Sequence, residues 1–165
     1  MQDLLPELCD LYPEQVKLLD PIFTLYGAKP LFWGQVVTVK CWQDNSRVKE
    51  LLATPGEGKV LVVDGGGSVE RALMGDLIAD SAYVQGWAGV VINGAIRDVS
   101  AINTMDLGVR ALAACPMRTD RKGLGELDCS IEFAGQEIKP GMFIYADENG
   151  VLVSEQALEL PEGFA

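Results

Sequence analysis

The sequence contains no histidine, and this absence excludes several classes of site. Without imidazole there can be no Ser-His-Asp or Cys-His nucleophile system, no histidine general base and no zinc site built on histidine. Proton transfer must use Asp, Glu, Lys, Tyr, Cys or water. A bound metal would be held mainly by oxygen atoms, which favours a hard cation such as Mg²⁺ or Mn²⁺.

Basic residues are scarce. The 165 residues include 13 Lys and Arg against 24 Asp and Glu, for a net charge of −11. Nucleic acid is therefore disfavoured as a direct partner, because binding to phosphates needs a basic face. The same charge suits a basic protein partner.

Cysteine motifs and long apolar runs are absent as well. Cys9, Cys41, Cys115 and Cys129 form no CxxC pair, which excludes a zinc knuckle or a thioredoxin motif, and we expect buried, reduced thiols. Residues 1–7 lack the basic region of a signal peptide, and no apolar run approaches the roughly 18 residues of a membrane span. We expect a soluble, cytoplasmic protein.

The length and the apolar pattern predict one α/β domain over residues 1–165. Strands are expected at 35–42, 59–64, 88–93 and 109–115, and helices at 3–20, 47–53, 75–86 and 98–106. Strands and helices that alternate with short links indicate a parallel sheet with right-handed crossovers. Short extended pieces at 129–134, 136–139, 142–146 and 151–154 predict a β-rich C-terminal edge, so that the sheet is mixed.

Three loops within residues 65–98 are candidates for a binding site. The run Asp64-Gly65-Gly66-Gly67-Ser68 could bring backbone N–H groups to an anion, or it could be only a tight turn. Its spacing fits neither a Rossmann nor a P-loop motif. Gly75-Asp76-Leu77-Ile78 begins a predicted helix, where free N–H groups and the helix dipole attract carboxylates or phosphates. The alternative is an ordinary N-cap formed by Asp76.

The third loop follows the predicted strand 88–93. Arg97 offers a planar fork suited to a carboxylate, and Asp98 offers a hard oxygen ligand for a divalent cation. The alternative is a surface ion pair with a helix cap. If strands 59–64 and 88–93 are neighbours, all three loops converge at the carboxyl ends of the strands, where α/β proteins bind ligands.

Other residues are weaker candidates. The densest basic stretch, residues 118–126, could bind an anionic substrate or a neighbouring subunit, although such loops are more often solvated. Lys40 could be a Schiff-base lysine, but an alternating strand places it on the solvent face. Trp33, Trp42 and Trp87 are expected in the core or in a subunit contact.

Together these segments resemble one family. The run VVDGGGSVERALMGDLIADSAYVQGWAGVVINGAIRDV (62–99), with DLGVRALAACP (106–116), YADENGVLVS (145–154) and the upstream TVKCWQDNSRVKELL (38–52), is similar to the RraA family. The resemblance covers nearly the whole chain. The family includes RraA regulators of ribonuclease E and metal-dependent 4-hydroxy-4-methyl-2-oxoglutarate aldolases that also decarboxylate oxaloacetate. A methyltransferase name once given to some members finds no independent support in these residues.

The resemblance implies a compact, swivelling-domain-like α/β/β domain that assembles as a ring-shaped homotrimer, with sites near subunit interfaces. It implies that Gly75, Asp76, Leu77 and Ile78 bind substrate, that Arg97 binds substrate and serves catalysis with Asp98, and that Asp98 is the ligand of Mg²⁺ or Mn²⁺. The metal would chelate a 2-keto acid and stabilise a pyruvate enolate after C–C cleavage or loss of CO₂. Aldolase members carry an acidic residue three positions after that aspartate, where this chain has Ala101.

Three functions are therefore weighed. The first is a metal-dependent lyase acting on short 2-keto diacids. The second is a protein that binds and restrains ribonuclease E, and the two are compatible in one molecule. The third is a structural trimer without activity.

Overall fold

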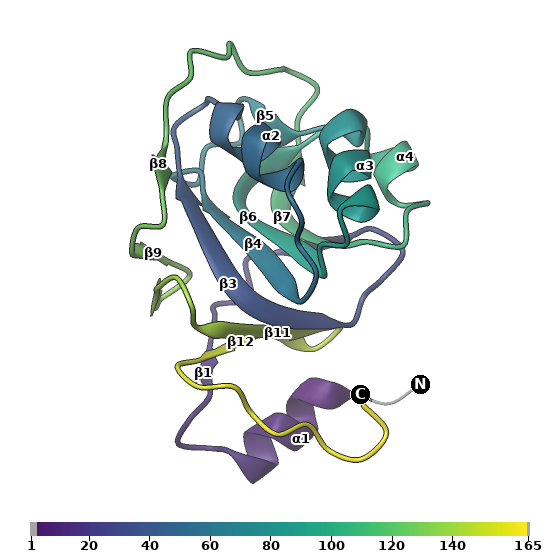
Figure 1. The fold of residues 1–165 in the computed structure, drawn as a ribbon, viewed down its shortest axis with the longest axis vertical. Coiled ribbons are helices and arrows are strands. Elements are labelled where there is room, and N and C mark those ends of the chain that lie inside the picture. Colours follow the sequence, from purple (N-terminus) through teal and green to yellow (C-terminus); the bar gives the residue numbers. More distant parts are fainter. Residues whose placement is uncertain (1–2, 165) are drawn as a thin grey trace.

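Four parallel strands form the centre of the sheet in the computed structural model, which describes residues 3–164. They lie side by side in the order β3-β4-β6-β7 (Figure 1). Their bounds are Phe32–Lys40 for β3, Lys59–Asp64 for β4, Gly89–Ile96 for β6 and Gly108–Ala114 for β7. The expected parallel arrangement is confirmed, and β4 and β6 are direct neighbours.

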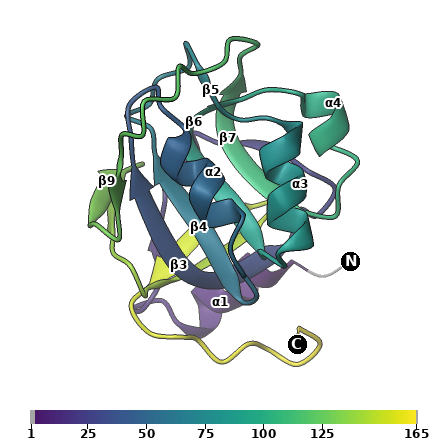
Figure 2. The same ribbon diagram turned by 45° about the horizontal axis from the view of Figure 1, so that its top comes forward.

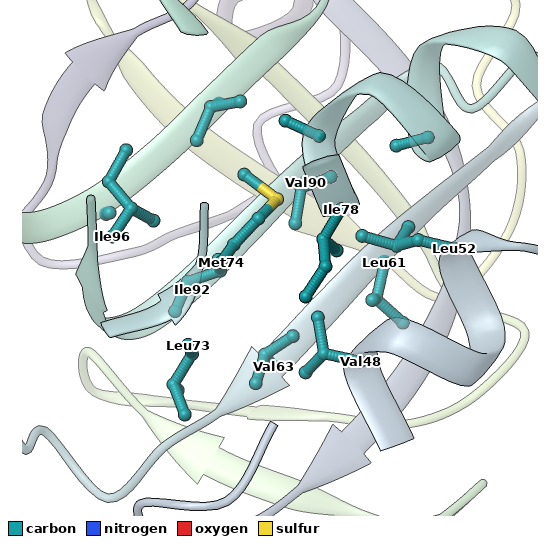
Figure 3. Packing of buried hydrophobic residues seen from close by; sticks show 14 of the residues in the cluster. Val48, Leu52, Leu61, Val63, Leu73, Met74, Ile78, Val90, Ile92 and Ile96 are labelled. Atoms are coloured by element: carbon teal, nitrogen blue, oxygen red, sulfur yellow. The ribbon is translucent and has the colours of Figure 1, made fainter. Parts of the chain in front are cut away.

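Three helices cover one face of these strands. They are α2 (Ser46–Leu52), α3 (Asp76–Val84) and α4 (Val99–Ile102), and Figure 2 shows α2 and α3 lying over the strands. Val48 and Leu52 lie four residues apart, so both point from the same side of α2 toward Leu61 and Val63 (Figure 3). Burying one such side chain is worth about 1.5–3 kcal/mol, so this layer holds the helix starts firmly over the strand ends.

Antiparallel strands extend the sheet at both edges. Its full order is β1-β12-β11-β3-β4-β6-β7-β2, with β5 paired to β6 and β8 paired to β3, while β9 and β10 form a separate hairpin. Their bounds are Lys17–Leu18 (β1), Thr24–Tyr26 (β2), Ala72–Met74 (β5), Glu126–Leu127 (β8), Ile131–Phe133 (β9), Gln136–Ile138 (β10), Phe143–Asp147 (β11) and Gly150–Ser154 (β12). The fold is thus a mixed α/β architecture, and the β-rich C-terminal edge is confirmed.

Arg110 shows how strongly the sheet curls. It lies on β7, yet its Nη2 donates to the carbonyl oxygen of Asp147 at 3.1 Å, at the end of β11. Its guanidinium also lies 5.2 Å from the centre of the Phe32 ring. Burial lowers the pKa of Arg110 to about 10, although nearby Asp147 and Glu148 favour the charged form. The Arg110 side chain therefore links β7 to β11, although these strands are four places apart in the sheet.

The Phe32 ring occupies space that two glycines leave free. A Cβ atom on Gly89 would lie 2.2 Å from the ring, and one on Gly108 would lie 2.1 Å from it. Both distances are far below van der Waals contact, so β6 and β7 need glycine where Phe32 crosses them.

We expect Gly89→Ala to lower the free energy of unfolding by about 1–3 kcal/mol through overpacking against Phe32. Urea denaturation measures the change. If the Phe32 ring is the cause, adding Phe32→Leu will give a combined loss smaller than the sum of the two single losses. A Gly89→Ala protein as stable as the parent would contradict the account.

The N-terminal segment differs from the predicted helical arm at 3–20. Helix α1 (Leu4–Leu11) ends early, and β1 then adds to the free edge of β12. Pro13 disfavours helical backbone at Tyr12, whose φ is −129°. The main-chain N–H of Leu5 donates to the carboxylate of Asp147 at 2.9 Å, which fixes α1 against the β11–β12 turn. The expectation of one helical arm is therefore wrong beyond Leu11.

The other helices and strands differ from their predicted bounds by a few residues, and the sequence does not predict four short strands. The helix expected at 98–106 is reduced to α4, and the strand expected at 88–93 continues to Ile96. The unpredicted strands β1, β2, β5 and β8 have two or three residues each, too few for an alternating pattern to show. Within residues 3–164, no helix is long and apolar enough to cross a membrane.

All four cysteines are free. Cys41 and Cys115 are buried as expected, Cys129 is half-buried, and Cys9 is exposed, so the expectation of buried thiols is wrong for Cys9. Burial, helped by Asp44 and Asp64, raises the pKa of Cys41 to about 12. Cys41 is therefore a protonated core residue rather than a nucleophile.

Candidate functional site

A pocket of about 540 Å³ opens where several strands end. The loops after β3, β5, β6 and β7 all contribute to it, so it lies at the carboxyl ends of the parallel strands. Its lining consists of Asn45, Ala72, Gly75, Asp76, Leu77, Ile78, Arg97, Asp98, Arg118, Thr119, Asp120 and Arg121. The structure thus brings together two of the three predicted loops and half of the basic stretch.

Gly75 is the N-cap of α3 in extended backbone, and as a glycine it supplies no side-chain cap of its own. The N–H of Asp76 donates to the carboxylate Oδ2 of Asp98 at 3.0 Å. Helix geometry leaves the N–H groups of Leu77 and Ile78 without an intrahelical acceptor. Gly75 rather than Asp76 is the N-cap, so the alternative of Asp76 acting as its own N-cap is wrong. Leu77 and Ile78 line the pocket, and their N–H groups lie at the positive end of the helix dipole.

Asp98 is held in an unusual backbone conformation. Its φ of 58° and ψ of 41° place it in the left-handed region, which costs roughly 1–3 kcal/mol for a residue other than glycine. Its side chain makes no capping bond to α4. A Cβ atom on Gly75 would lie 2.6 Å from Asp98 Oδ2, so the carboxylate fits only because position 75 is glycine.

Arg97 is fixed through its main chain and one long side-chain contact. Its N–H donates to the carbonyl of Met74 at 2.9 Å, and its Nη1 reaches the carbonyl of Pro116 at 3.5 Å. Its Nε lies 4.0 Å from Asp98 Oδ2, and both side chains are about 40% exposed, at 39% and 40%. The alternative prediction was a surface ion pair between Arg97 and Asp98, with a cap on the following helix. It fits poorly, because the two charged groups are 4.0 Å apart and Asp98 does not cap α4.

Residues 118–121 form another part of the pocket wall. The Thr119 hydroxyl donates to Asn45 Oδ1 at 2.8 Å, and Arg121 Nε donates to the same oxygen at 3.0 Å. The Arg118 carbonyl accepts from Arg71 Nη1 at 3.1 Å. The basic stretch is therefore partly a pocket wall rather than only solvated surface. Sequence reasoning missed Asn45, since nothing in its local pattern points to residues more than 70 positions away.

Asp44 binds the residues that directly follow this wall in the chain. Its buried carboxylate accepts from the N–H and hydroxyl of Ser46, from the N–H of Lys122 at 2.8 Å and from the N–H of Leu124 at 3.2 Å. Burial alone would raise its pKa, but these hydrogen bonds outweigh burial and lower the pKa of Asp44 to about 2.

This lowered pKa predicts a pH dependence of stability. A carboxyl group with a depressed pKa stabilises the fold above its ordinary pKa of 3.8, and this contribution is lost as the pH falls toward 2. We expect Asp44→Asn to be less stable than the parent at neutral pH, with the difference shrinking below pH 4. Urea denaturation from pH 7 to pH 2.5 measures it. A difference that stays constant across this range would contradict the assignment.

The pocket is electrically balanced in a strongly acidic protein. Arg97, Arg118 and Arg121 line it, as do Asp76, Asp98 and Asp120, while the whole chain carries −11. An anion therefore meets no net negative charge inside the pocket, and guanidinium groups can bind its carboxylates.

The glycine-rich loop at residues 64–68 is a tight turn and does not bind an anion through its N–H groups. The N–H groups of Gly65 and Gly67 donate to the Asn93 carbonyl, and that of Gly66 donates to Asp64 Oδ1. Gly66 and Gly67 have φ values of 67° and 77°, which suit glycine. The anion-binding interpretation is therefore wrong, because the Asn93 carbonyl on β6 and the Asp64 carboxylate already accept from these donors. The loop does not line the pocket, so only two of the three loops converge.

Lys40 and the tryptophans lie outside the pocket. Lys40 is exposed at the end of β3 opposite Asp64 and Glu126, which agrees with its expected place on the solvent face. Trp87 is 5% exposed and belongs to the core, as expected, and Trp33 is half-buried. Trp42 is 64% exposed and is therefore not a core residue, so for it the other expectation, a subunit contact, stays a prediction.

The donor set fits a hydrated hard cation. Among residues 3–164, no group of three or more Asp, Glu, Cys or His side chains could hold a metal. Mg²⁺ commonly binds through one or two carboxylates and keeps several waters. Asp98 offers such a carboxylate at the pocket, with Asp76 and Asp120 in the same lining. Ala101, three positions after Asp98, lies half-buried in α4 and adds no oxygen ligand.

Comparison with known proteins identifies the family. The family model RraA-like, described as Aldolase/RraA, matches residues 5–153. A protein of Marinomonas sp. named "Putative 4-hydroxy-4-methyl-2-oxoglutarate aldolase" is 55% identical over 98% of this chain and 100% of its own length. A protein of the same name from Ectopseudomonas mendocina is 54% identical over the same shares.

Solved structures agree with this result. The RNA-processing inhibitor RraA from Thermus thermophilis superposes with a TM-score of 0.91 at 40% identity, covering 99% of this chain and 98% of the other. An S-adenosylmethionine:2-dimethylmenaquinone methyltransferase from Geobacillus kaustophilus gives 0.92 at 40% identity, covering 96% and 97%. The chain belongs to the RraA-like family of Aldolase/RraA proteins.

Proposed function

We propose that this protein is a divalent-metal-dependent lyase. It cleaves 4-hydroxy-4-methyl-2-oxoglutarate to pyruvate and decarboxylates oxaloacetate. One observation carries the proposal: Arg97, the free N–H groups at the start of α3 and the Asp98 carboxylate line a single pocket. The full-length similarity to proteins named as this aldolase supports the choice of substrate.

The substrate is a dianion, so the pocket must bind carboxylates. Arg97 presents a planar fork that can form two parallel hydrogen bonds with one carboxylate. The N–H groups of Leu77 and Ile78, at the positive end of the α3 dipole, supply further donors. These groups orient the 2-keto acid with its reacting carbons toward Asp98.

Asp98 is the residue that would hold the divalent cation, either Mg²⁺ or Mn²⁺, together with water. When bound there, the cation supplies Lewis-acid chemistry, since it polarises the 2-keto group and stabilises the negative charge that develops on it. Gly75 and the Asp76 N–H keep the carboxylate in place for this task. The chain has no histidine to act as the proton donor, and we assign the transfer of the proton to the pyruvate product to water.

The experiment is an assay for pyruvate. Purified protein with Mg²⁺ is mixed with 4-hydroxy-4-methyl-2-oxoglutarate or oxaloacetate, and pyruvate is followed with a coupled dehydrogenase. We expect pyruvate from both substrates, loss of activity with EDTA and recovery when Mg²⁺ is restored. No pyruvate from either substrate, with Mg²⁺ or with Mn²⁺ in its place, would overturn the proposal.

We further infer that residues 1–165 form one RraA-like domain that assembles as a ring-shaped homotrimer, in which a neighbour completes the site. Leu77 and Met117 support this inference, because they lie at or near the pocket and are apolar side chains that are 81% and 52% exposed. Light scattering should give a mass three times 17.8 kDa, and the mass of one chain would contradict the trimer.

We also propose that the protein is cytoplasmic, and its free cysteines agree with this location.

A second function, restraint of ribonuclease E, has its own support. The neighbour from Thermus thermophilis is named as an RNA-processing inhibitor, and the charge of −11 suits a basic partner region. A pull-down with the ribonuclease at rising salt tests it. We expect a complex that weakens as salt increases, and no complex at low salt would exclude this function.

A further inference from the structure

The loop at 118–124 is bound along nearly its whole length by the segment that begins α2. Three successive N–H groups, those of Lys122, Gly123 and Leu124, donate to Asp44 Oδ2, Ser46 Oγ and again Asp44 Oδ2. The Gly123 carbonyl accepts from Arg47 Nη2. An exposed, basic, glycine-containing loop would ordinarily be mobile, and this one is anchored.

The Asn45 side chain binds the loop at 118–124 instead of capping its own helix, α2. As the N-cap of α2, an asparagine would normally accept a hydrogen bond from an N–H of the first turn. Here the cap position has no such bond, and Asn45 Oδ1 accepts from Thr119 and Arg121 instead. The N–H of Asn45 in turn donates to the Thr119 hydroxyl at 3.4 Å. The side chain best placed to stabilise α2 is thus used to hold the loop.

The anchored loop also orients the pocket. Residues 122–124 bind Asp44 and Ser46, and directly before them Arg118 to Arg121 line the pocket. Thr119 and Asn45 are both buried, so the connection between anchor and wall is not a loose surface contact. Displacement of residues 122–124 would therefore move Arg121 away from the pocket.

We propose that Asp44 and Ser46 are positioning residues that set the substrate-binding pocket by fixing the wall at 118–121 through the anchored residues 122–124. They touch no substrate and act through Thr119 and Arg121. The effect on substrate binding rests on the proposed lyase function, whereas the anchoring itself does not.

The anchoring is tested by limited trypsin digestion, since Arg118, Arg121 and Lys122 are cleavage sites inside the loop. We expect Asp44→Asn to be cut there about tenfold faster than the parent, as the loop opens locally. Asp147→Asn is the matched control. Asp147 is also a buried aspartate that accepts main-chain N–H bonds, from Leu5 and Asn149, on a different part of the molecule. Equal loop cleavage in both variants at equal thermal stability would overturn the anchoring.

The positioning role is tested by kinetics on the same variants with oxaloacetate and Mg²⁺. We expect Asp44→Asn to raise KM about fivefold or more with a smaller change in kcat, and Asp147→Asn to leave KM unchanged. Faster loop cleavage with an unchanged KM would overturn the role in substrate binding while leaving the anchor intact. A parent protein without activity would overturn the lyase function alone. If Asp44→Asn does not fold, Ser46→Ala removes the Gly123 acceptor and one hydrogen bond to Asp44 but keeps the Asp44 carboxylate, and the same cleavage and KM criteria apply to it.

Discussion

Gly75→Ala is expected to lower kcat/KM about 100-fold, the size of loss that a displacement of roughly 1 Å in a reacting group can cause. The added Cβ atom would lie 2.6 Å from Asp98 Oδ2 and 3.4 Å from Arg97 Nε. Because the obstructed atom is the tip of a side chain, Asp98 can rotate away, and the fold tolerates the change. The φ of −115° and ψ of −166° at position 75 also suit alanine.

The cost in stability should be small by comparison. Alanine is a poorer N-cap than glycine, so the free energy of unfolding should fall by only about 1 kcal/mol. Steady-state kinetics and urea denaturation on the same samples separate the two effects. Asp80→Ala, an exposed change on the same helix, is the control. Full activity in Gly75→Ala would show that the position of the Asp98 carboxylate does not matter.

Arg97→Ala is expected to lower kcat/KM about 100-fold, since the variant loses the two-pronged hydrogen bond to a substrate carboxylate, and a hydrogen bond to a charged group is worth about 1.5–3 kcal/mol. Arg97→Lys should recover only part of the loss, because lysine keeps the charge but lacks the two-pronged geometry. Stability should change little, since the side chain is partly exposed and makes one hydrogen bond of 3.5 Å. Kinetics with thermal melts check both points. Unchanged kinetic constants in Arg97→Ala would remove Arg97 from the substrate site.

The sequence predicts the centre of this fold well, because those elements are defined locally. The strand at 59–64 was predicted with its observed bounds, since an apolar run lies between a lysine and a glycine turn. Strand β5 could not be predicted, because three residues show no period, and it is a strand because it pairs with the end of β6. The same holds for β1, which follows from the free edge of β12 rather than from its own residues.

The candidate site shows the same division. Arg97, Asp98 and the helix start at 75–78 stand out locally, since each follows a strand or opens a helix. The wall at 118–121 stands out only as part of a basic stretch, and its place in the pocket could not be predicted, because its orientation depends on Asp44, which lies 78 positions from Lys122. The glycine loop stands out locally but is not part of the site, since its N–H donors are used by Asp64 and by the Asn93 carbonyl of the neighbouring strand β6. Local patterns predicted which residues are polar and near strand ends, and long-range hydrogen bonds decided which of them line the pocket.

The balanced charge of the pocket accounts for how an acidic protein can bind a dianion. Three arginines offset three aspartates there, so the remaining negative charge lies elsewhere on the chain. Screening at physiological salt limits the reach of that distant charge to about 8 Å. The acidic surface therefore remains available for a basic partner without preventing substrate entry.

The central claim is that Asp98 holds the divalent cation that the lyase reaction requires. Its most direct test is the rate of pyruvate formation from 4-hydroxy-4-methyl-2-oxoglutarate as Mg²⁺ is added back to metal-stripped protein, for the parent and for Asp98→Asn. We predict a saturable rise for the parent and no rise for Asp98→Asn over the same concentrations. Superimposable curves, or no pyruvate from the parent at any Mg²⁺ concentration, would contradict the account.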